Sequence, residues 1–311
     1  MRGKIVLLYE TEPGKELCEV ASQVIADTAV AFGHAISLPV KRCPRGAEVP
    51  DEVLDLCADA QGILAGESGM ACLPDLAAEL LCLCRMRELR HAHLIENHAL
   101  MGEACPLKAV LIQALDSTEE ALKAAAAQAY AVSMREHLPI AQVPPAGKLA
   151  QPWKAAVDSA ASLSAPFHAR ETLLPQVVPD IVHRPARMGV ILCPPYAGSV
   201  LAEAAAALTG AEGMCYDSYL EGQCPLYAPV RPEGAPVNPF GMLRAVHSLL
   251  RSMKLEKEAD CVEAALRNVL QAGWRTEDLM CPTAHLMDAA GIANLMCQQI
   301  EVAGEWINHA E

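Results

Sequence analysis

Short apolar runs alternate with segments of helical periodicity along the first half of the chain. The apolar run at residues 4–9 is typical of a buried strand, whereas Leu17, Val20 and Val24 recur at the spacing of one helical face. Regular alternation of this kind indicates an α/β fold with an open, mostly parallel sheet flanked by helices. The predicted strands of this half are residues 4–9, 36–40, 62–65, 92–96 and 108–114, and the predicted helices are residues 16–32, 51–58, 76–90 and 117–137.

The pattern is interrupted after residue 137 by prolines and glycine. Residues 138–148 contain three prolines and Gly147, so regular structure is expected to stop there and the chain to form an excursion or arm. Residues 225–239 contain five prolines and are expected to form another loop. The predicted helices of this half are residues 153–164, 176–183, 240–254, 257–272 and 284–307.

A strand, a loop and a helix are predicted between residues 188 and 210. The apolar run at 188–193 reads as a buried strand, and prolines and Gly198 then break it. Ser199 is expected to cap an alanine-rich helix that ends near Gly210. Cys193, at the carboxyl end of this strand, lies where open α/β sheets bind ligands, but a buried cysteine is the preferred interpretation because no base is evident beside it.

Composition narrows the class of protein. The 311 residues are 52% hydrophobic and 20% charged, which indicates a folded chain long enough for two domains or one large α/β unit. A net charge of −14 without a long Lys/Arg run argues against a nucleic-acid partner. No apolar stretch reaches the roughly 18 residues of a membrane span, so no membrane partner is expected. Thirteen cysteines without a signal peptide favour a reducing, cytoplasmic setting.

Several segments, in the same order along the chain, resemble those of the β-decarboxylating dehydrogenases, the family of isopropylmalate and isocitrate dehydrogenases. Residues 198–205, GSVLAEAA, are similar to the family's Gly-Asp-Ile-Leu-Ser-Asp-Glu-Ala, and residues 208–214, LTGAEGM, to its Leu-Thr-Gly-Ser-Leu-Gly-Met. Residues 52–60 and 273–279 also resemble family segments. The chain is therefore interpreted as a divergent member of this family.

The resemblance implies a two-domain fold and a homodimer. The first domain would be discontinuous, with residues 1–98 and 229–311, and residues 99–228 would form the second domain with the dimer contacts and the arm. The alanine-rich helix at 199–209 would pack closely at the dimer interface, because small side chains permit a close approach.

The resemblance also locates the metal site. The family binds Mg²⁺ or Mn²⁺ with three Asp carboxylates, and hard oxygen ligands suit these ions. The matching positions here are Ser199, Glu203 and Pro175. Only Glu203 keeps a carboxylate, and it is the one metal ligand that this comparison offers.

The family's other functional groups are matched only in part. Its Leu-Arg-Pro substrate segment falls near Glu96, and Arg85, Arg87 and Arg90 on the predicted helix offer an alternative clamp for a carboxylate beside Ser199. The family's proton-shuttling Tyr falls near residues 115–117 and its Lys on the segment 142–145, with Lys148 as the nearest lysine. From the loop that holds the adenine side of NAD, Asn238 with Pro239 remains.

A transition-metal site is an independent candidate. His91 and His93 would share one face of a predicted strand, with Glu96 and His98 close by. The alternative interpretation is that these polar residues line a cleft or a sheet edge, since no cysteine pair at ligand spacing accompanies them.

Two functions follow from these patterns. The first is a non-catalytic or regulatory protein that keeps the dehydrogenase fold after the joint loss of metal, substrate and NAD groups. The second is an active NAD(P)-dependent oxidoreductase that binds a divergent 2-hydroxy acid and uses Glu203, Lys148 or the histidines. A small-molecule ligand is compatible with both, and the fold alone does not separate them.

Overall fold

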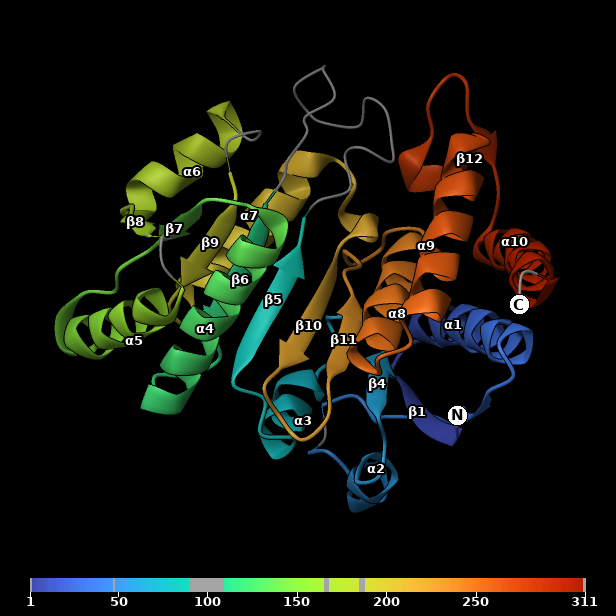
Figure 1. The fold of residues 1–311 in the computed structure, drawn as a ribbon, viewed down its shortest axis with the longest axis horizontal. Helices are drawn as coiled ribbons and strands as arrows, with labels where there is room; N and C mark the ends of the chain where they lie inside the picture. The colour runs from blue at the N-terminus through green and yellow to red at the C-terminus, as the bar shows by residue number, and fades with distance from the viewer. Residues whose placement is uncertain (1, 47, 90–108, 165–167, 185–187, 310–311) are drawn as a thin grey trace. The chain divides into compact units, whose positions relative to one another are not determined.

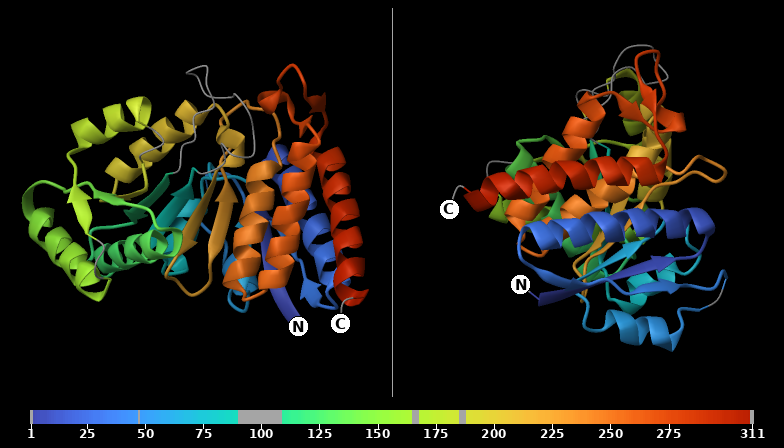
Figure 2. Two further views of the ribbon diagram at one scale, coloured as in Figure 1. Left: turned by 45° about the horizontal axis from the view of Figure 1, so that its top comes forward. Right: turned by 90° about the vertical axis from the view of Figure 1, so that its right-hand side faces the viewer.

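The computed structural model describes residues 2–46, 48–89, 109–164, 168–184 and 188–309, the last few of them by their backbone only. The chain divides into two compact units, shown in Figures 1 and 2. Unit 1 comprises Met1–Leu80, Glu212–Ser218 and Gln223–Glu311, and unit 2 comprises Leu81–Ala211 and Tyr219–Gly222. The domain boundary predicted at residue 98 lies outside the described residues, and the predicted domains stay a prediction.

Unit 1 is built on parallel strands. Strand β1 (Arg2–Tyr9) pairs in parallel with β2 (Ala35–Ser37), β3 (Val40–Arg42) and β4 (Gly62–Ala65), and β4 pairs in parallel with β11 (Leu226–Pro229). Successive residues 5–8 of β1 are all fully buried. Since neighbouring side chains of a strand point to opposite faces, helices must cover both faces of this sheet, which explains the continuous apolar run.

The helices of unit 1 follow from their apolar faces and their caps. Helix α1 (Glu12–Ala31) is capped by Thr11, whose hydroxyl accepts a hydrogen bond from the Gly14 amide. It packs along α10 (Ala289–His309) and contacts α8 (Phe240–Ser252), which lies against α9 (Glu256–Gln271), as Figure 2 shows. The smaller elements of unit 1 are α2 (Asp51–Cys57), α3 (Leu73–Glu79), β12 (Trp274–Arg275) and β13 (His285–Leu286).

Unit 2 contains one antiparallel strand beside parallel ones. Strand β5 (Cys84–Glu88) pairs antiparallel with β6 (Val110–Ala114). Strand β6 pairs in parallel with β9 (Val190–Cys193), β9 with β7 (Ile140–Gln142), and β7 with β8 (Ala169–Glu171). The helices of this unit are α4 (Glu119–Glu136), α5 (Ala150–Leu163), α6 (Leu174–His183) and α7 (Ala197–Thr209), and β10 (Tyr216–Leu220) begins in unit 1 and ends in unit 2.

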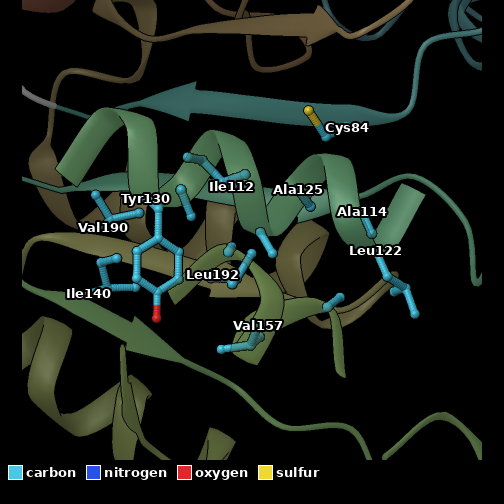
Figure 3. Close-up of a cluster of buried hydrophobic side chains, with 14 of the residues drawn as sticks. Cys84, Ile112, Ala114, Leu122, Ala125, Tyr130, Ile140, Val157, Val190 and Leu192 are labelled. Carbon is cyan, nitrogen blue, oxygen red and sulfur yellow. The ribbon is translucent and has the colours of Figure 1, made fainter. Parts of the chain in front are cut away.

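The core of unit 2 forms between α4, α5 and the sheet (Figure 3). Helix α4 turns alanines such as Ala125 toward the strands, and these small side chains let the helix lie close to Ile112 and Leu192. The largest core side chains keep a hydrogen bond at their polar ends. Trp153 donates from Nε1 to Gln142 Oε1 at 2.7 Å, and the Tyr130 hydroxyl accepts from the Ala169 amide at 3.1 Å.

Most predicted elements are confirmed, but four predictions are wrong. The helix predicted at 76–90 ends at Glu79, and residues 84–88 form strand β5 because pairing with β6 overrides the helix propensity of the arginines. Regular structure does not stop throughout 138–148, because β7 pairs with both β8 and β9. Strand β11 lies within the predicted loop at 225–239, where its pairing with β4 buries it.

The fourth correction concerns the start of α7. The helix begins at Ala197, so Ser199 lies in its first turn and is not the cap. Tyr196 precedes the helix with φ 68° and ψ −50°, and the Ala197 amide donates to the Pro195 carbonyl at 2.9 Å. This is the geometry of a γ-turn, which is strained for a residue with a side chain. The helix thus begins three residues earlier than it would with Ser199 as its cap.

Among the described residues, no helix is sufficiently long and apolar to cross a membrane.

The start of α1 approaches the end of β4 so closely that position 66 admits only glycine. A Cβ on Gly66 would lie 2.5 Å from the Gly14 carbonyl oxygen, whereas a Cβ on Gly69 would meet nothing within 4 Å. We therefore expect Gly66→Ala to lower the free energy of unfolding by about 1 to 3 kcal/mol, because the backbone of α1 must shift. Gly69→Ala, the matched control, should change it by less than about 0.5 kcal/mol in urea titrations. Equal effects would contradict this packing.

Candidate functional site

The polar residues of unit 2 gather where β5, β6 and the first turns of α7 meet. Arg85 and Arg87 are two residues apart on β5 and therefore point to the same face of the sheet. Gln113 of β6 is the direct cross-strand partner of Arg85. Helix α7 contacts both β6 and β9, and this places Ser199 and Glu203 above the two arginines.

Ser199 is held in a small polar network. Arg85 donates from Nη2 to Gln113 Oε1 at 2.9 Å and to Ser199 Oγ at 3.2 Å, and Gln113 Nε2 lies 3.3 Å from the same hydroxyl. A Cβ on Gly198 would lie 2.5 Å from Gln113 Oε1. Glycine at 198 therefore lets α7 lie against the Gln113 amide, and this contact fixes the position of Ser199.

Glu203 forms an ion pair with Arg87. Arg87 Nη1 donates to Glu203 Oε1 at 2.7 Å, and the Arg87 side chain is only 1% exposed while that of Glu203 is 63% exposed. A guanidinium remains charged in proteins, so burial requires acceptors for its N–H groups. Glu203 supplies one of them from the solvent side, and the pair ties α7 to β5.

This arrangement does not fit a divalent metal bound in the family manner. Glu203 is the only carboxylate at the three matched positions, since Pro175 lies exposed in the first turn of α6 and Ser199 accepts from Arg85. A Mg²⁺ or Mn²⁺ ion needs several oxygen ligands. Here the ion would have to share the Glu203 carboxylate with the Arg87 guanidinium, whose positive charge would repel it.

The predicted acid–base residues do not join this network. Lys148 lies exposed in a short 3-10 helix, Gly147–Leu149. Asp116 accepts hydrogen bonds from the amide and the hydroxyl of Thr118, at 2.8 and 2.5 Å, and so shapes the start of α4. Glu96, Arg90 and the histidines at 91, 93 and 98 lie outside the described residues. Sequence reasoning missed Gln113, which only the antiparallel β5–β6 pairing brings beside Arg85.

A second polar cluster lies at the carboxyl ends of β1, β4 and β11 in unit 1, the edge where open α/β sheets bind ligands. The buried Glu67 follows β4 and accepts from Thr11 Oγ1 at 2.5 Å and from Arg231 Nη1 at 3.1 Å. Glu10 follows β1, is buried as well, and accepts from the Ala71 amide at 2.7 Å. Two carboxylates thus occupy this edge.

These residues do not fit a dinucleotide bound in the family manner. The positive charges at this edge are already paired with carboxylates, Arg45 with Glu10 and Arg231 with Glu67, whereas phosphate sites present unpaired backbone N–H groups and positive charge. Asn238, the predicted cofactor contact, is buried and engaged at both ends of its amide. Its Nδ2 donates to Asp278 Oδ2 at 2.7 Å, and its Oδ1 accepts from the Phe240 amide at 2.9 Å.

Cys193 does not present a nucleophile. Its side chain is fully buried, and this burial raises the pKa of the thiol far above its usual range. The thiol therefore stays protonated, as the buried-cysteine interpretation of the sequence expects.

The chain is an α/β protein with a mostly parallel sheet and a polar network beside the helix that follows β9. The family model for isocitrate/isopropylmalate dehydrogenase matches residues 77–295. The chain belongs to this family, and the recognition made from the sequence is confirmed.

Individual relatives agree with this assignment at low identity. A 3-isopropylmalate dehydrogenase from Halalkalibacterium halodurans is 22% identical over 359 residues, covering 97% of this chain and 99% of that protein. One from Moorella thermoacetica is 30% identical over 129 residues, which cover 39% of this chain and 36% of that protein. The family resemblance is thus full in length and weak in identity.

Solved structures share the fold. The isocitrate dehydrogenase of Methylococcus capsulatus superposes with a TM-score of 0.79 at 16% identity, covering 96% of this chain and 99% of that one. A chain in the peripheral stalk of the Euglena gracilis mitochondrial ATP synthase superposes with a TM-score of 0.74 at 15% identity, with the same coverage.

The Arg87–Glu203 pair should stabilise unit 2. We expect Glu203→Gln to lower the free energy of unfolding by about 1 to 2 kcal/mol, because the buried guanidinium loses a charged acceptor while water screens the exposed side of the pair. Glu119→Gln is the matched control, since Glu119 is similarly exposed and pairs with the exposed Lys123. Its effect in urea titrations should be much smaller. Equal effects of the two substitutions would show that the pair adds nothing beyond a surface contact.

Proposed function

We propose that this chain is a non-catalytic, regulatory or structural, member of the isocitrate/isopropylmalate dehydrogenase family. The observation that carries the proposal is the Arg87–Glu203 ion pair, in which a buried guanidinium holds the single carboxylate left at the matched metal positions. A guanidinium supplies positive charge and hydrogen bonds. It has no open coordination position, so it cannot bind a substrate hydroxyl directly and promote its deprotonation as a metal ion does.

The matched acid–base positions support the same conclusion. Where the family carries its proton-shuttling Lys, the sequence comparison places Val143, which is buried and donates its amide to the Leu192 carbonyl at 2.8 Å. The family's Tyr falls near residues 115–117, where the chain has no tyrosine and Asp116 accepts hydrogen bonds from Thr118 at the start of α4. At these matched positions a valine and an aspartate thus stand where the family carries its Lys and Tyr.

A dehydrogenase fold does not by itself imply dehydrogenase activity. A chain in the peripheral stalk of an ATP synthase has this same fold. The fold therefore also occurs in a protein whose description names its place in an assembly and no dehydrogenase reaction. The network around Ser199 nevertheless offers guanidinium N–H groups, which suit a small carboxylate ligand. The competing proposal is therefore an active NAD(P)-dependent oxidoreductase for a divergent 2-hydroxy acid.

An activity assay separates the two proposals. The full chain with Mn²⁺ and NAD or NADP should reduce neither cofactor in the presence of isopropylmalate, isocitrate, malate or tartrate. The 3-isopropylmalate dehydrogenase of Halalkalibacterium halodurans, assayed in parallel, provides the positive control. Titration calorimetry should show no heat from NAD, NADP or Mn²⁺ that depends on Glu203. Mn²⁺-dependent cofactor reduction that Glu203→Gln abolishes would overturn the proposal.

We further propose that the protein is a homodimer in a reducing compartment and that α7 lies at the interface. Helix α7 presents an exposed apolar stripe of Val200, Ala204 and Ala207, with the exposed Tyr196 just before the helix. The exposed fraction is 73% for Val200 and 86% for Tyr196. An exposed stripe of this kind gains stability when a second copy covers it. The cysteines of the described chain are free thiols, which suit such a compartment.

The dimer can be tested at Val200. We expect Val200→Lys to raise the dimer dissociation constant at least about tenfold in sedimentation experiments, because burying an ammonium group against an apolar surface is costly. Leu163→Lys is the control, since Leu163 is 85% exposed at the end of α5. It should leave the dimer intact. A monomeric wild-type chain, or equal dissociation constants for wild type and Val200→Lys, would contradict the interface.

A further inference from the structure

We propose that His247, Asp260 and Glu263 form a binding site for a divalent transition-metal ion such as Zn²⁺, Co²⁺ or Ni²⁺, between α8 and α9 of unit 1. The three side chains each offer one ligand atom, and these atoms all lie within 4.8 Å of one another. His247 lies on α8, and the two carboxylates lie on α9. The site is separate from the residues on which the proposed function rests.

The geometry needs only a small contraction to bind an ion. Metal–ligand bonds of about 2.1 Å in a tetrahedral site put the ligand atoms about 3.4 Å apart. His247 Nε2 already lies 3.9 Å from Glu263 Oε2. The imidazole is the better fixed ligand, with 21% of its side chain exposed, while Glu263 is 43% and Asp260 is 63% exposed. The carboxylates are thus the ligands that move toward the ion.

The site already holds a cation, the guanidinium of Arg251. Arg251 Nε donates to His247 Nε2 at 3.1 Å, and its Nη2 donates to Asp260 Oδ1 at 2.6 Å. The lone pair of Nε2 therefore faces the guanidinium, which places the imidazole proton on Nδ1. Metal binding through Nε2 needs this same tautomer. When an ion enters, the Arg251 side chain can swing toward Glu256, whose Oε2 lies 3.4 Å from Nη1.

The ligand set selects the class of metal. An imidazole nitrogen with two carboxylates suits Zn²⁺ and its neighbours, whereas Mg²⁺ and Ca²⁺ prefer oxygen ligands alone. Water would complete the coordination. Because the ligands come from both helices, the ion would join α8 to α9 and stabilise unit 1 by mass action.

Titration of the full chain with Co²⁺, followed by its visible absorption and by titration calorimetry, tests the site. Wild type should bind one ion with the spectrum of nitrogen and oxygen ligands. His247→Gln should lower the affinity at least about tenfold, as expected for loss of a ligand. His183→Gln is the matched control, because His183 is exposed at the end of α6, and it should bind like wild type.

The substitution Arg251→Gln removes the competing cation and should raise the Co²⁺ affinity about two- to fivefold, the equivalent of an exposed ion pair. This gain cannot arise from misfolding. Weaker binding by Arg251→Gln, equal binding by wild type and His247→Gln, or a near-ultraviolet thiolate band would each overturn the proposal.

Discussion

In a sheet that is buried on both faces, polar side chains can lie only at the ends of the strands and on the helices that start there. In unit 1, residues 5–8 of β1 and 62–65 of β4 are fully enclosed by apolar neighbours. Glu10 and Glu67 follow directly after these strands, and both carboxylates are buried. The same sheet that requires an apolar interior therefore concentrates charge at one edge, where each charge needs a partner.

The partners come from within the chain. Glu67 is satisfied by Thr11 and Arg231, and Arg87 by Glu203 among its acceptors. A buried charge that lacks its partner costs several kcal/mol, so such sites either bind a ligand or neutralise themselves. Self-neutralisation stabilises the fold in the absence of a ligand, but it leaves fewer groups to polarise a substrate or hold a phosphate.

The fold could be predicted from the sequence because its signals are local and repeated. The apolar run of β4 and the capping residue Thr118 before α4 specify their elements within a few residues. Strand β5 could not be predicted in this way. Its sequence, Cys84-Arg85-Met86-Arg87-Glu88, alternates apolar and polar residues over its first four positions only, which is a short signal, and its arginines favour a helix. Only the long-range pairing with β6 makes it a strand.

The error at β5 also explains what was missed at the candidate site. On a helix, Arg85 and Arg87 would point in different directions, and neither would meet Gln113. On a strand they share a face, and the register with β6 adds Gln113 to the network around Ser199. Glu203 stays a prediction as the one metal ligand at the matched positions, and its pairing with Arg87 depends on this change of element.

Three arginines each donate hydrogen bonds to the acceptors of a polar cluster, where a ligand or a metal ion could otherwise bind. Arg87 meets Glu203, Arg231 meets Glu67, and Arg251 meets His247 and Asp260. They differ in how firmly the guanidinium is held. The side chain of Arg87 is 1% exposed and that of Arg231 is 15% exposed, so moving either one away from its carboxylate would take a charged partner from a buried guanidinium. The side chain of Arg251 is 47% exposed, and a second carboxylate lies nearby. An incoming cation can therefore displace Arg251 more easily than it can displace Arg87 from Glu203. In the two proposals, the depth at which the guanidinium is buried, more than the number of carboxylates beside it, decides whether a metal ion can compete for the site.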